Sequence, residues 1–306
     1  ISVLKGANAA ALYGSRANNG AIVIVTKSGA GGKQGVTTNL GFTWQGSSAI
    51  FLDKMQNEYG QGGNGIYSPD AIVSWGSKMD GSDVAHWSND PNYYLYGQKY
   101  PYSPQPDNFK DYFQNGNSFA TNLQVNLNNQ TSNAAISYTN TNASGIIESN
   151  NLKSHNVSLR YGSKLGEKFT IDSKLTVIRQ KFENQFSTGE NFDNPLRYLY
   201  VEPRNIRTED LKHFEFTNAA GQVRQHYWRW NDNGTGNPYW TRNRVLQPET
   251  RQRIISMLSL KYQVIKDLSI MGRSAIDQSF RDREHKWYND TYTMAINGGY
   301  EKWNSS

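Results

Sequence analysis

The stretch that decides the fold reads Phe119-Ala-Thr-Asn-Leu-Gln-Val-Asn-Leu-Asn128. Its odd-numbered positions hold Phe, Thr, Leu, Val and Leu, whereas its even-numbered positions hold Ala, Asn, Gln, Asn and Asn. A period of two places alternate side chains on opposite faces of a β-strand. The stretch therefore predicts a strand with one apolar face and one strongly polar face.

The same alternation recurs along the chain and predicts seven strands in all. In each of them the apolar residues occupy one face, and Asn, Ser, Thr, Lys, Arg or Asp occupy the other. A sheet of this kind needs an apolar environment on one side only. The predicted strands are 36–44, 119–128, 134–141, 156–165, 169–177, 254–264 and 268–281.

The links between these strands alternate between short and long. Tight turns at one end and long loops at the other are typical of outer-membrane barrels. We therefore predict a mainly β protein, namely part of an antiparallel transmembrane β-barrel. A soluble β-sandwich could also contain seven strands, but loops as long as these are uncommon in sandwiches. The short turns lie at 129–133, 166–168 and 266–267, and the long links cover 47–116, about 142–153 and 184–250.

In a barrel the apolar faces meet lipid and the polar faces line a wet interior. With the short turns on the periplasmic side, Trp44, Phe119, Trp287 and Tyr288 stand at the outer ends of their strands, as in an interfacial girdle of aromatic residues. Aromatic residues are also common in strands generally, which is the alternative reading. The predicted interior residues are Asn122, Gln124, Asn126, Arg160, Lys164, Asp172, Lys174, Arg273 and Asp277.

Composition excludes several other classes of protein. No run approaches the roughly 18 apolar residues of a membrane-spanning helix, and the chain contains no Cys, which excludes disulfide frameworks and Cys nucleophiles. The 13% of aromatic residues is too high for a disordered tail. The net charge of +6 comes from scattered basic residues, so we expect no nucleic-acid partner.

Seven strands do not close a barrel of this kind. An open sheet edge in lipid leaves backbone N–H and C=O groups without partners, at a cost of several kcal/mol for each group. The chain also opens inside an apolar run at Ile1 and lacks a leader sequence before it. We therefore expect the chain to be a segment of a longer protein.

Residues 1–28 predict a separate compact unit. A short strand over 1–5 is followed by a helical stretch over 8–18 and a turn at Asn19-Gly20. The β-branched run over 21–26 predicts a strand that is buried on both faces. The Gly-rich segment 28–35 predicts a hinge.

The motif residues of this unit are Val3, Leu4, Lys5, Gly6, Tyr13, Gly14, Arg16, Asn19, Gly20, Thr26 and Lys27. They resemble the end of the plug domain in TonB-dependent outer-membrane transporters, and in detail the SusC/RagA subfamily. The likeness continues downstream at 74–76 with 79–81, at 102–113, and at 138–140 with 145–147. Ser2 departs from the family, where an acidic residue is usual.

The resemblance implies that 1–28 is the C-terminal end of a plug and that 29–306 is the first part of a barrel of roughly 22 strands. It implies import of an oligosaccharide or peptide across the bacterial outer membrane, with energy from the TonB complex through a segment upstream, a SusD-like lipoprotein as partner and outer-membrane lipid around the barrel. A siderophore receptor of the same fold is an alternative that the Asn19-Gly20 pattern disfavours. A soluble, secreted carbohydrate-binding β-protein is a more distant alternative.

The long loops supply the candidate substrate contacts. Aromatic faces cover the apolar faces of sugar rings, and Arg pairs with carboxylates. The alternative, to which we give more weight, is that these side chains pack the loops together or hold a lid protein. The segment 107–116 predicts a short helix with clustered aromatic residues. The candidates are Trp75, Trp87, Tyr94, Trp228, Trp230, Trp240, Arg229 and Arg242.

The sequence contains no recognisable pattern for catalysis or for a cofactor. The five His residues share no metal-ligand spacing and belong to no recognisable triad. Asp80, Asp83 and Asp90 lack the spacing of an EF-hand, and 29–33 lacks that of a P-loop. We therefore expect no enzymatic activity, no cofactor and no metal.

Overall fold

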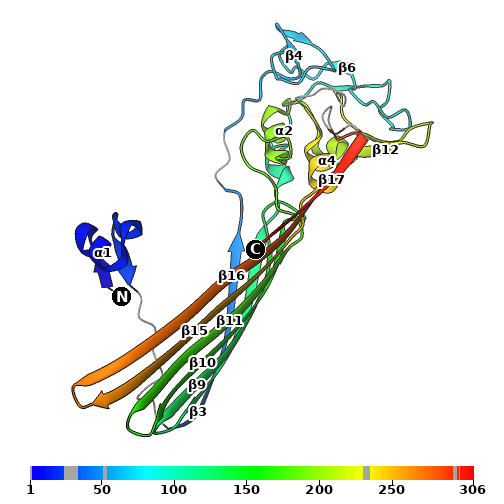
Figure 1. The fold of residues 1–306 in the computed structure, drawn as a ribbon. Coiled ribbons are helices and arrows are strands. Elements are labelled where there is room, and N and C mark those ends of the chain that lie inside the picture. Colours follow the sequence, from blue (N-terminus) through cyan, green and yellow to red (C-terminus); the bar gives the residue numbers. More distant parts are fainter. Residues whose placement is uncertain (1, 24–33, 51–53, 230–234, 292–294, 296) are drawn as a thin grey trace.

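The structure is a computed structural model, and it describes residues 2–23, 34–50, 54–229, 235–291, 295 and 297–306. Long antiparallel strands form a curved sheet, a compact region of loops and short helices lies at one end of it, and a small N-terminal unit stands apart (Figure 1). None of the helices in these ranges is both long enough and apolar enough to cross a membrane.

In the described residues the main sheet has nine strands, in the order β14-β16-β15-β11-β10-β9-β8-β3, with β17 also paired to β16. All seven predicted strands are present, and the tight turns between β8 and β9, β10 and β11, and β15 and β16 fall where they were predicted. The strands are β3 (Gly35–Ser47), β8 (Gly116–Asn128), β9 (Ser132–Ser144), β10 (Asn151–Leu165), β11 (Phe169–Phe182), β14 (Val245–Leu246), β15 (Glu249–Ile265), β16 (Leu268–Asn289) and β17 (Asn297–Ser305).

Three predictions about this region were wrong or incomplete. The link between β9 and β10 is not long, because both strands continue past their apolar residues and leave only 145–150 between them. The helix over 107–116 is reduced to the 3-10 turn η2 (Lys110–Tyr112), since Phe113 is extended and the N–H of Gln114 bonds to the carbonyl of Ile146 at 2.8 Å. Strands β14 and β17 were missed.

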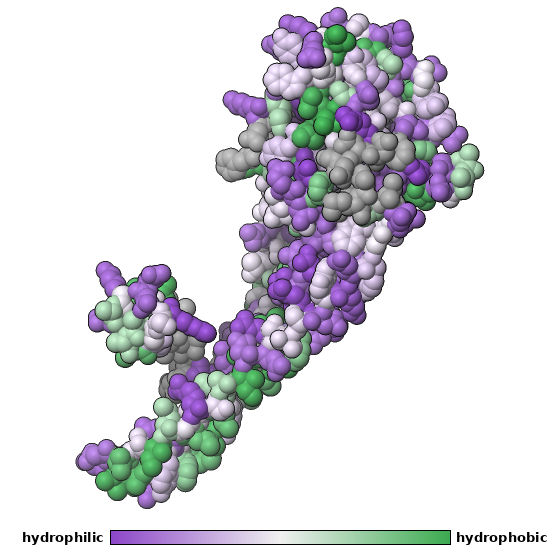
Figure 2. Space-filling view, turned by 45° about the horizontal axis from the view of Figure 1, so that its top comes forward, coloured by the Kyte–Doolittle hydropathy of each residue, from purple (hydrophilic) through white to green (hydrophobic). Residues whose placement is uncertain are grey.

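One face of the sheet carries an apolar belt from β3 to β15. Successive strands place Leu40, Leu123, Tyr138, Val157, Val177 and Ile254 directly opposite one another. Among the described residues no second sheet covers this face, and Leu123 is 41% exposed. Apolar side chains are visible along the lower part of the strands, with hydrophilic side chains between them and the loops (Figure 2). A sandwich would bury this face, so the sandwich alternative is wrong.

The apolar belt also shifts along the strands from one edge of the sheet to the other. The apolar stretch of β3, from Val36 to Trp44, corresponds row by row to Ser274–Asp282 of β16. The apolar stretch of β16 itself runs from Leu268 to Phe280 and is therefore displaced toward the tight turns. Strands tilted by about 35–45° produce this displacement when the belt is level. The pattern thus fits a tilted barrel wall.

The opposite face of the sheet carries hydrogen bonds and ion pairs between strands. Arg253 donates to Asp277 at 2.7 and 2.5 Å, and Asn122 Nδ2 donates to Thr139 Oγ1 at 2.8 Å. These groups lie on the face that the sequence predicts to be the interior.

The N-terminal unit contains β1 (Ser2–Leu4), α1 (Gly6–Tyr13), the 3-10 turn η1 (Ser15–Ala17) and β2 (Ala21–Val23), with β1 antiparallel to β2. The helical stretch is broken at Gly14, which has a φ of 75°. The prediction that the β2 segment is buried on both faces was wrong for Ile22, which is 67% exposed. Within the described residues β2 pairs with β1 alone, and the face that carries Ile22 is exposed. Thr26 and Lys27 lie outside the described residues. The predicted hinge over 28–35 also lies outside them, except for positions 34 and 35.

The loops between β3 and β8 and between β11 and β15 fold together at the end of the sheet opposite the tight turns (Figure 1). We call this assembly the loop region. Its elements are β4 (Gly62–Gly63), β5 (Ile66–Tyr67), β6 (Asp83–Ala85), β7 (Lys99–Pro101), α2 (Pro195–Val201), α3 (Thr208–Lys212), β12 (Glu215–Thr217), β13 (Val223–Gln225) and α4 (Pro238–Arg244).

Candidate functional site

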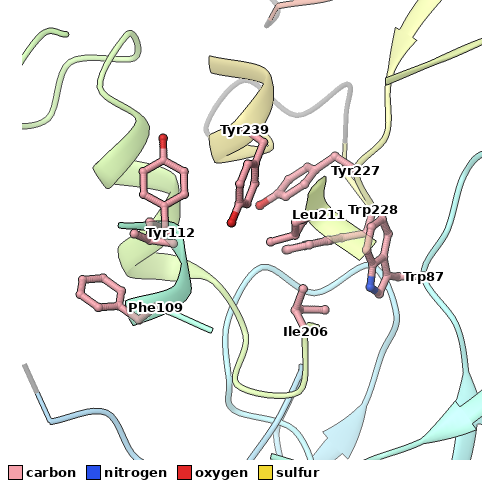
Figure 3. Packing of buried hydrophobic residues seen from close by; sticks show 9 residues of the cluster. Trp87, Phe109, Tyr112, Ile206, Leu211, Tyr227, Trp228 and Tyr239 are labelled. Carbon is pink, nitrogen blue, oxygen red and sulfur yellow. The ribbon is translucent and has the colours of Figure 1, made fainter. Parts of the chain in front are cut away.

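The loop region has a hydrophobic core of its own, which we call the loop core. Aromatic rings from the two long loops meet there, with Trp87 and Trp228 packed edge to face at 5.3 Å and Tyr112 and Tyr239 at 5.1 Å (Figure 3). Such edge contacts add to the stabilisation from burial. The members are Trp87, Phe109, Tyr112, Leu199, Ile206, Leu211, Tyr227, Trp228 and Tyr239.

Arg204 joins the two long loops through backbone carbonyls. Its guanidinium donates to the carbonyls of Gln56, Gln105 and Pro106 at 3.1, 3.0 and 2.9 Å, and its side chain is buried. Burial raises the pKa of the neighbouring Glu202 well above its ordinary value, although the charge of Arg204 opposes this rise. Because a buried guanidinium needs all its partners, Arg204 ties loops that lie far apart in the sequence.

A second buried network centres on Asp210 of α3. Its carboxylate lies 3.1 Å from His86 Nε2, and it accepts hydrogen bonds from Tyr93 Oη at 2.6 Å and Arg207 Nε at 2.8 Å. Burial alone would raise the pKa of Asp210, but the hydrogen bonds from His86, Arg207 and Tyr93 outweigh it and lower the pKa. The carboxylate therefore stays charged inside the loop region.

His226 lies beside this network and is fully buried. Its Nδ1 lies 2.6 Å from the carbonyl oxygen of His213, and its Nε2 lies 2.8 Å from Ser88 Oγ. Burial lowers the pKa of His226 to about 4, and electrostatic repulsion from His213 acts in the same direction. The ring is therefore neutral at pH 7.

This arrangement does not make a catalytic triad. Ser88 is buried, and a backbone carbonyl stands where a triad has a carboxylate. Among the described residues no group of three His, Cys, Asp or Glu side chains could hold a metal ion. The hydrogen bond between His226 and Ser88 connects the two long loops, and the bond to the carbonyl of His213 lies within the second of them.

Helix α4 positions two of the candidate side chains. Asn237 caps its N-terminus by accepting from the N–H of Tyr239 at 2.8 Å, and Pro238 occupies the first turn. Trp240 is then fully buried, while Arg242 lies over the ring of Tyr239 at 4.8 Å. Arg242 also pairs with Glu148, in the turn between β9 and β10, at 2.8 Å. The helix thus fastens the loop region to the sheet.

Two clefts flank the hairpin of β12 and β13. One has a volume of about 860 Å³ and opens between the hairpin, the end of β16 and the start of β17. The other has about 700 Å³ and lies between the hairpin and residues 89–92. Arg224 lines both clefts and lies 3.3 Å from Asp290. Aromatic, amide and charged groups around one opening suit a polar ligand with apolar faces.

The substrate-contact candidates divide into buried and exposed groups. Trp87 and Trp228 are buried in the packed loops, and Trp240 is buried at the wall of the larger cleft. Trp75 is 74% exposed and Tyr94 is 65% exposed, and the structure does not bring these two into either cleft. Arg242 is engaged with Glu148, Arg229 is partly buried, and Trp230 lies outside the described residues.

Of the substrate-contact candidates, Trp240 lines the larger cleft, but sequence reasoning did not assign a binding role to the other residues that form it. Tyr288, Tyr300 and Lys286 line it because β17 pairs with the end of β16. Gly298 and Gly299 were the available signal: the φ of Gly298 is 72°, and a Cβ on Gly299 would lie 3.1 Å from the ring of Trp287. Two adjacent glycines beside an aromatic cluster indicate a turn into a close-packed strand.

Most of the N-terminal motif residues lie on the surface of their unit. Val3, Lys5, Tyr13, Arg16 and Asn19 are exposed, and the motif glycines adopt positive φ. Gly20 approaches the other strand closely, since a Cβ there would lie 3.0 Å from the carbonyl oxygen of Leu4. The remaining described members, Leu4, Gly6 and Gly14, form the strand end, the helix start and the helix stop.

No protein-family model matches the chain. Over 289 residues, or 92% of its length, the chain is 24% identical to the TonB-dependent receptor SusC of Bacteroides thetaiotaomicron, of which it spans 24%. The structure is similar to three solved structures of the RagAB peptide importer or transporter, with TM-scores of 0.58, 0.59 and 0.60 at 15% identity. Each structural match covers 94% of this chain and 32–33% of the solved chain.

The chain therefore spans about a quarter of the curated relative and a third of the solved ones. The likeness to the solved structures establishes the fold, which is part of an antiparallel β-barrel. The resemblance to SusC/RagA-type TonB-dependent receptors that the motifs indicated is confirmed by the sequence match along nearly the whole chain.

Proposed function

We propose that the chain is part of a TonB-dependent importer of the bacterial outer membrane, and that the complete protein takes up an oligosaccharide or a peptide. The observation that carries the proposal is the uncovered apolar face of the sheet, typified by Leu123, Val157 and Val177. Burying exposed apolar surface contributes roughly 25 cal/mol per Å². Acyl chains are the environment that satisfies such a face without a second sheet.

The N-terminal unit fits the proposed role as the end of a plug. Residues 1–28 would form this end, and residues 29–306 the first part of the barrel. In the described residues the β1–β2 pair is a sheet separate from the barrel wall. The TonB complex would act on the plug through a segment that precedes it, and no bond-making step is needed.

The loop region is the proposed surface for substrate and for a SusD-like lipoprotein. The two clefts beside Arg224 offer aromatic, amide and cationic groups to a sugar ring or a peptide carboxylate. Trp75 and Tyr94 are the candidates that remain available at the surface. Their position outside the clefts favours contact with a partner protein over contact with substrate.

The proposal is tested on the complete protein in its own cell. We expect it to sediment with the outer membrane, to resist unfolding in mild detergent at moderate temperature, and to support uptake of a glycan or peptide only when the TonB complex is energised. Recovery as a soluble monomer would overturn the membrane assignment. Uptake of ferric siderophores in place of glycans and peptides would favour the siderophore-receptor alternative.

A further inference from the structure

Basic side chains gather on the apolar face of the sheet at the outer ends of β10 and β11. Lys153 and His155 of β10 lie directly opposite Lys181 and Arg179 of β11, and all four are exposed. We call these four residues the basic cluster. Every member lies on the face that carries the apolar belt, at the end of the sheet near the loop region.

The basic cluster begins in the row next to the last apolar pair. Val157 and Val177 face each other two positions below His155 and Arg179. At the level of His155 and Arg179 the flanking strands carry uncharged Asn140 and Gln252. The positive charge of the cluster therefore lies on β10 and β11 and borders the apolar belt directly. In the row of Lys153 and Lys181, the carboxylate of Asp282 on β16 lies on the same face, separated from Lys181 by Thr250 of β15.

Charge balance within the sheet does not explain this arrangement. Like charges directly opposite each other on neighbouring strands are destabilising. Among the described residues, Lys153 of the basic cluster forms an ion pair with Glu183, with Nζ 3.9 Å from Oε1. Neighbouring strands lie about 4.8 Å apart, and alternate residues of a strand about 6.7 Å apart. One anionic group could therefore reach several of these side chains.

The hydrogen bonds of His155 fix which ring nitrogen carries the proton. Its Nδ1 lies 2.8 Å from Tyr138 Oη and 3.2 Å from Asn140 Nδ2. An amide NH2 group only donates, so Nδ1 is the acceptor and the neutral ring carries its proton on Nε2. The cluster thus presents N–H donors from all four side chains, which is the chemistry that binds phosphate.

We propose that the basic cluster binds the phosphate of a phosphorylated glycolipid in the outer leaflet, whose acyl chains lie on the belt below Val157 and Val177. A free phosphate ion would use the same donors. The adjoining apolar belt favours a ligand that carries both phosphate and acyl chains, since each part then meets its complement. The inference rests on the proposed function, because it requires the barrel to stand in an outer membrane.

The test uses the complete protein in detergent, with bisphosphorylated lipid A as the probe and native mass spectrometry as the readout. We expect the double variant Arg179→Gln/Lys181→Gln to bind the lipid at least tenfold more weakly than the unmodified protein. The matched control is Lys164→Gln/Lys174→Gln, which removes two charges from the opposite face of the same two strands and leaves lipid binding unchanged.

Two further arms identify the ligand. Dephosphorylated lipid A is expected to bind the unmodified protein as weakly as the double variant binds the phosphorylated lipid. Inorganic phosphate at an equal concentration is expected not to displace the lipid. Equal binding by the double variant and the unmodified protein, equal binding of the dephosphorylated lipid, or displacement by phosphate would each overturn the proposal.

Membrane fractionation of the cells that produce the unmodified protein separates this proposal from the proposed function. If the unmodified protein is absent from the outer membrane, the proposed function fails and this inference fails with it. If the protein is present there and the lipid-binding results are negative, this inference alone fails.

Discussion

The loop region and the sheet are stabilised in different ways, although they are parts of one chain. After the N-terminal unit, every buried apolar side chain among the described residues lies between Trp87 and Val245, in the loops and their short elements. The long strands are held by their backbone ladders and leave apolar side chains such as Phe42 and Leu159 exposed. The loops can therefore keep their shape in water, whereas the sheet depends on an apolar environment on one face.

The largest effect is expected from Trp240→Ala in the loop region. Removing a fully buried indole leaves a cavity and lowers the free energy of unfolding by about 3–5 kcal/mol. The readout is the urea concentration at which protease cleaves 184–250 in the complete protein. The control Trp75→Ala, at an exposed position, should shift that free energy by less than about 0.5 kcal/mol. Equal shifts would mean that the loops lack an independent core.

Acid should remove the contribution of His226 to the stability of the loop region. His226 has a folded-state pKa of about 4, against about 6.5 in the unfolded chain. The unfolded chain therefore binds this proton first as the pH falls, so His226 alone takes away about 3 kcal/mol between pH 6.5 and 4. Glu202 acts in the opposite direction, because burial raises its folded-state pKa. The same urea and protease assay should therefore show that the stability of the unmodified protein falls relative to that of His226→Gln across this range. Equal pH dependence in the two proteins would contradict the assignment.

A charge on the apolar face tests whether the sheet depends on contact with lipid. Leu159→Arg should disfavour the lipid-inserted form by about 2 kcal/mol, which suits a position between the middle and the edge of the belt. The measurement is the folded fraction in lipid vesicles. This fraction is read from gels as the protein whose mobility changes when the sample is heated. Gln124→Arg, on the polar face, is the control and should fold as the unmodified protein does. If both variants insert equally well, the apolar face does not meet lipid.

The smallest effect is expected where the two regions join. Arg242→Gln removes the ion pair with Glu148, whose carboxylate is largely exposed, and should cost about 0.5–1 kcal/mol. A double-mutant cycle with Glu148→Gln measures the coupling between the two side chains. A coupling near zero would mean that the packing of α4, and not this ion pair, attaches the loop region to the sheet.

The strands could be predicted from the sequence because alternation is a local property. The period of two in β8, β10 and β11 appears in any window of a few residues, and the turns at 166–168 and 266–267 are equally local. Strand β17 was missed because Gly298 and Gly299 interrupt its pattern, and only pairing with β16 defines it. The ends of β9 and β10 were missed because both of their faces are polar above the belt.

Burial in the loops could not be predicted in the same way. Trp75 and Trp87 both belong to the first long loop, yet one is exposed and the other lies in the loop core. The difference comes from Trp228, which reaches Trp87 from the second long loop. No local pattern reports which distant loop folds over a given residue.

From the order of residues alone one can obtain the class of fold, the strands joined by tight turns and the side of each strand that avoids water, because these follow from neighbours in the chain. The three-dimensional arrangement was needed to reveal the loop core, the clefts beside Arg224 and the basic cluster. Each of these brings together residues from separate strands or loops, and such encounters depend on how the whole chain packs.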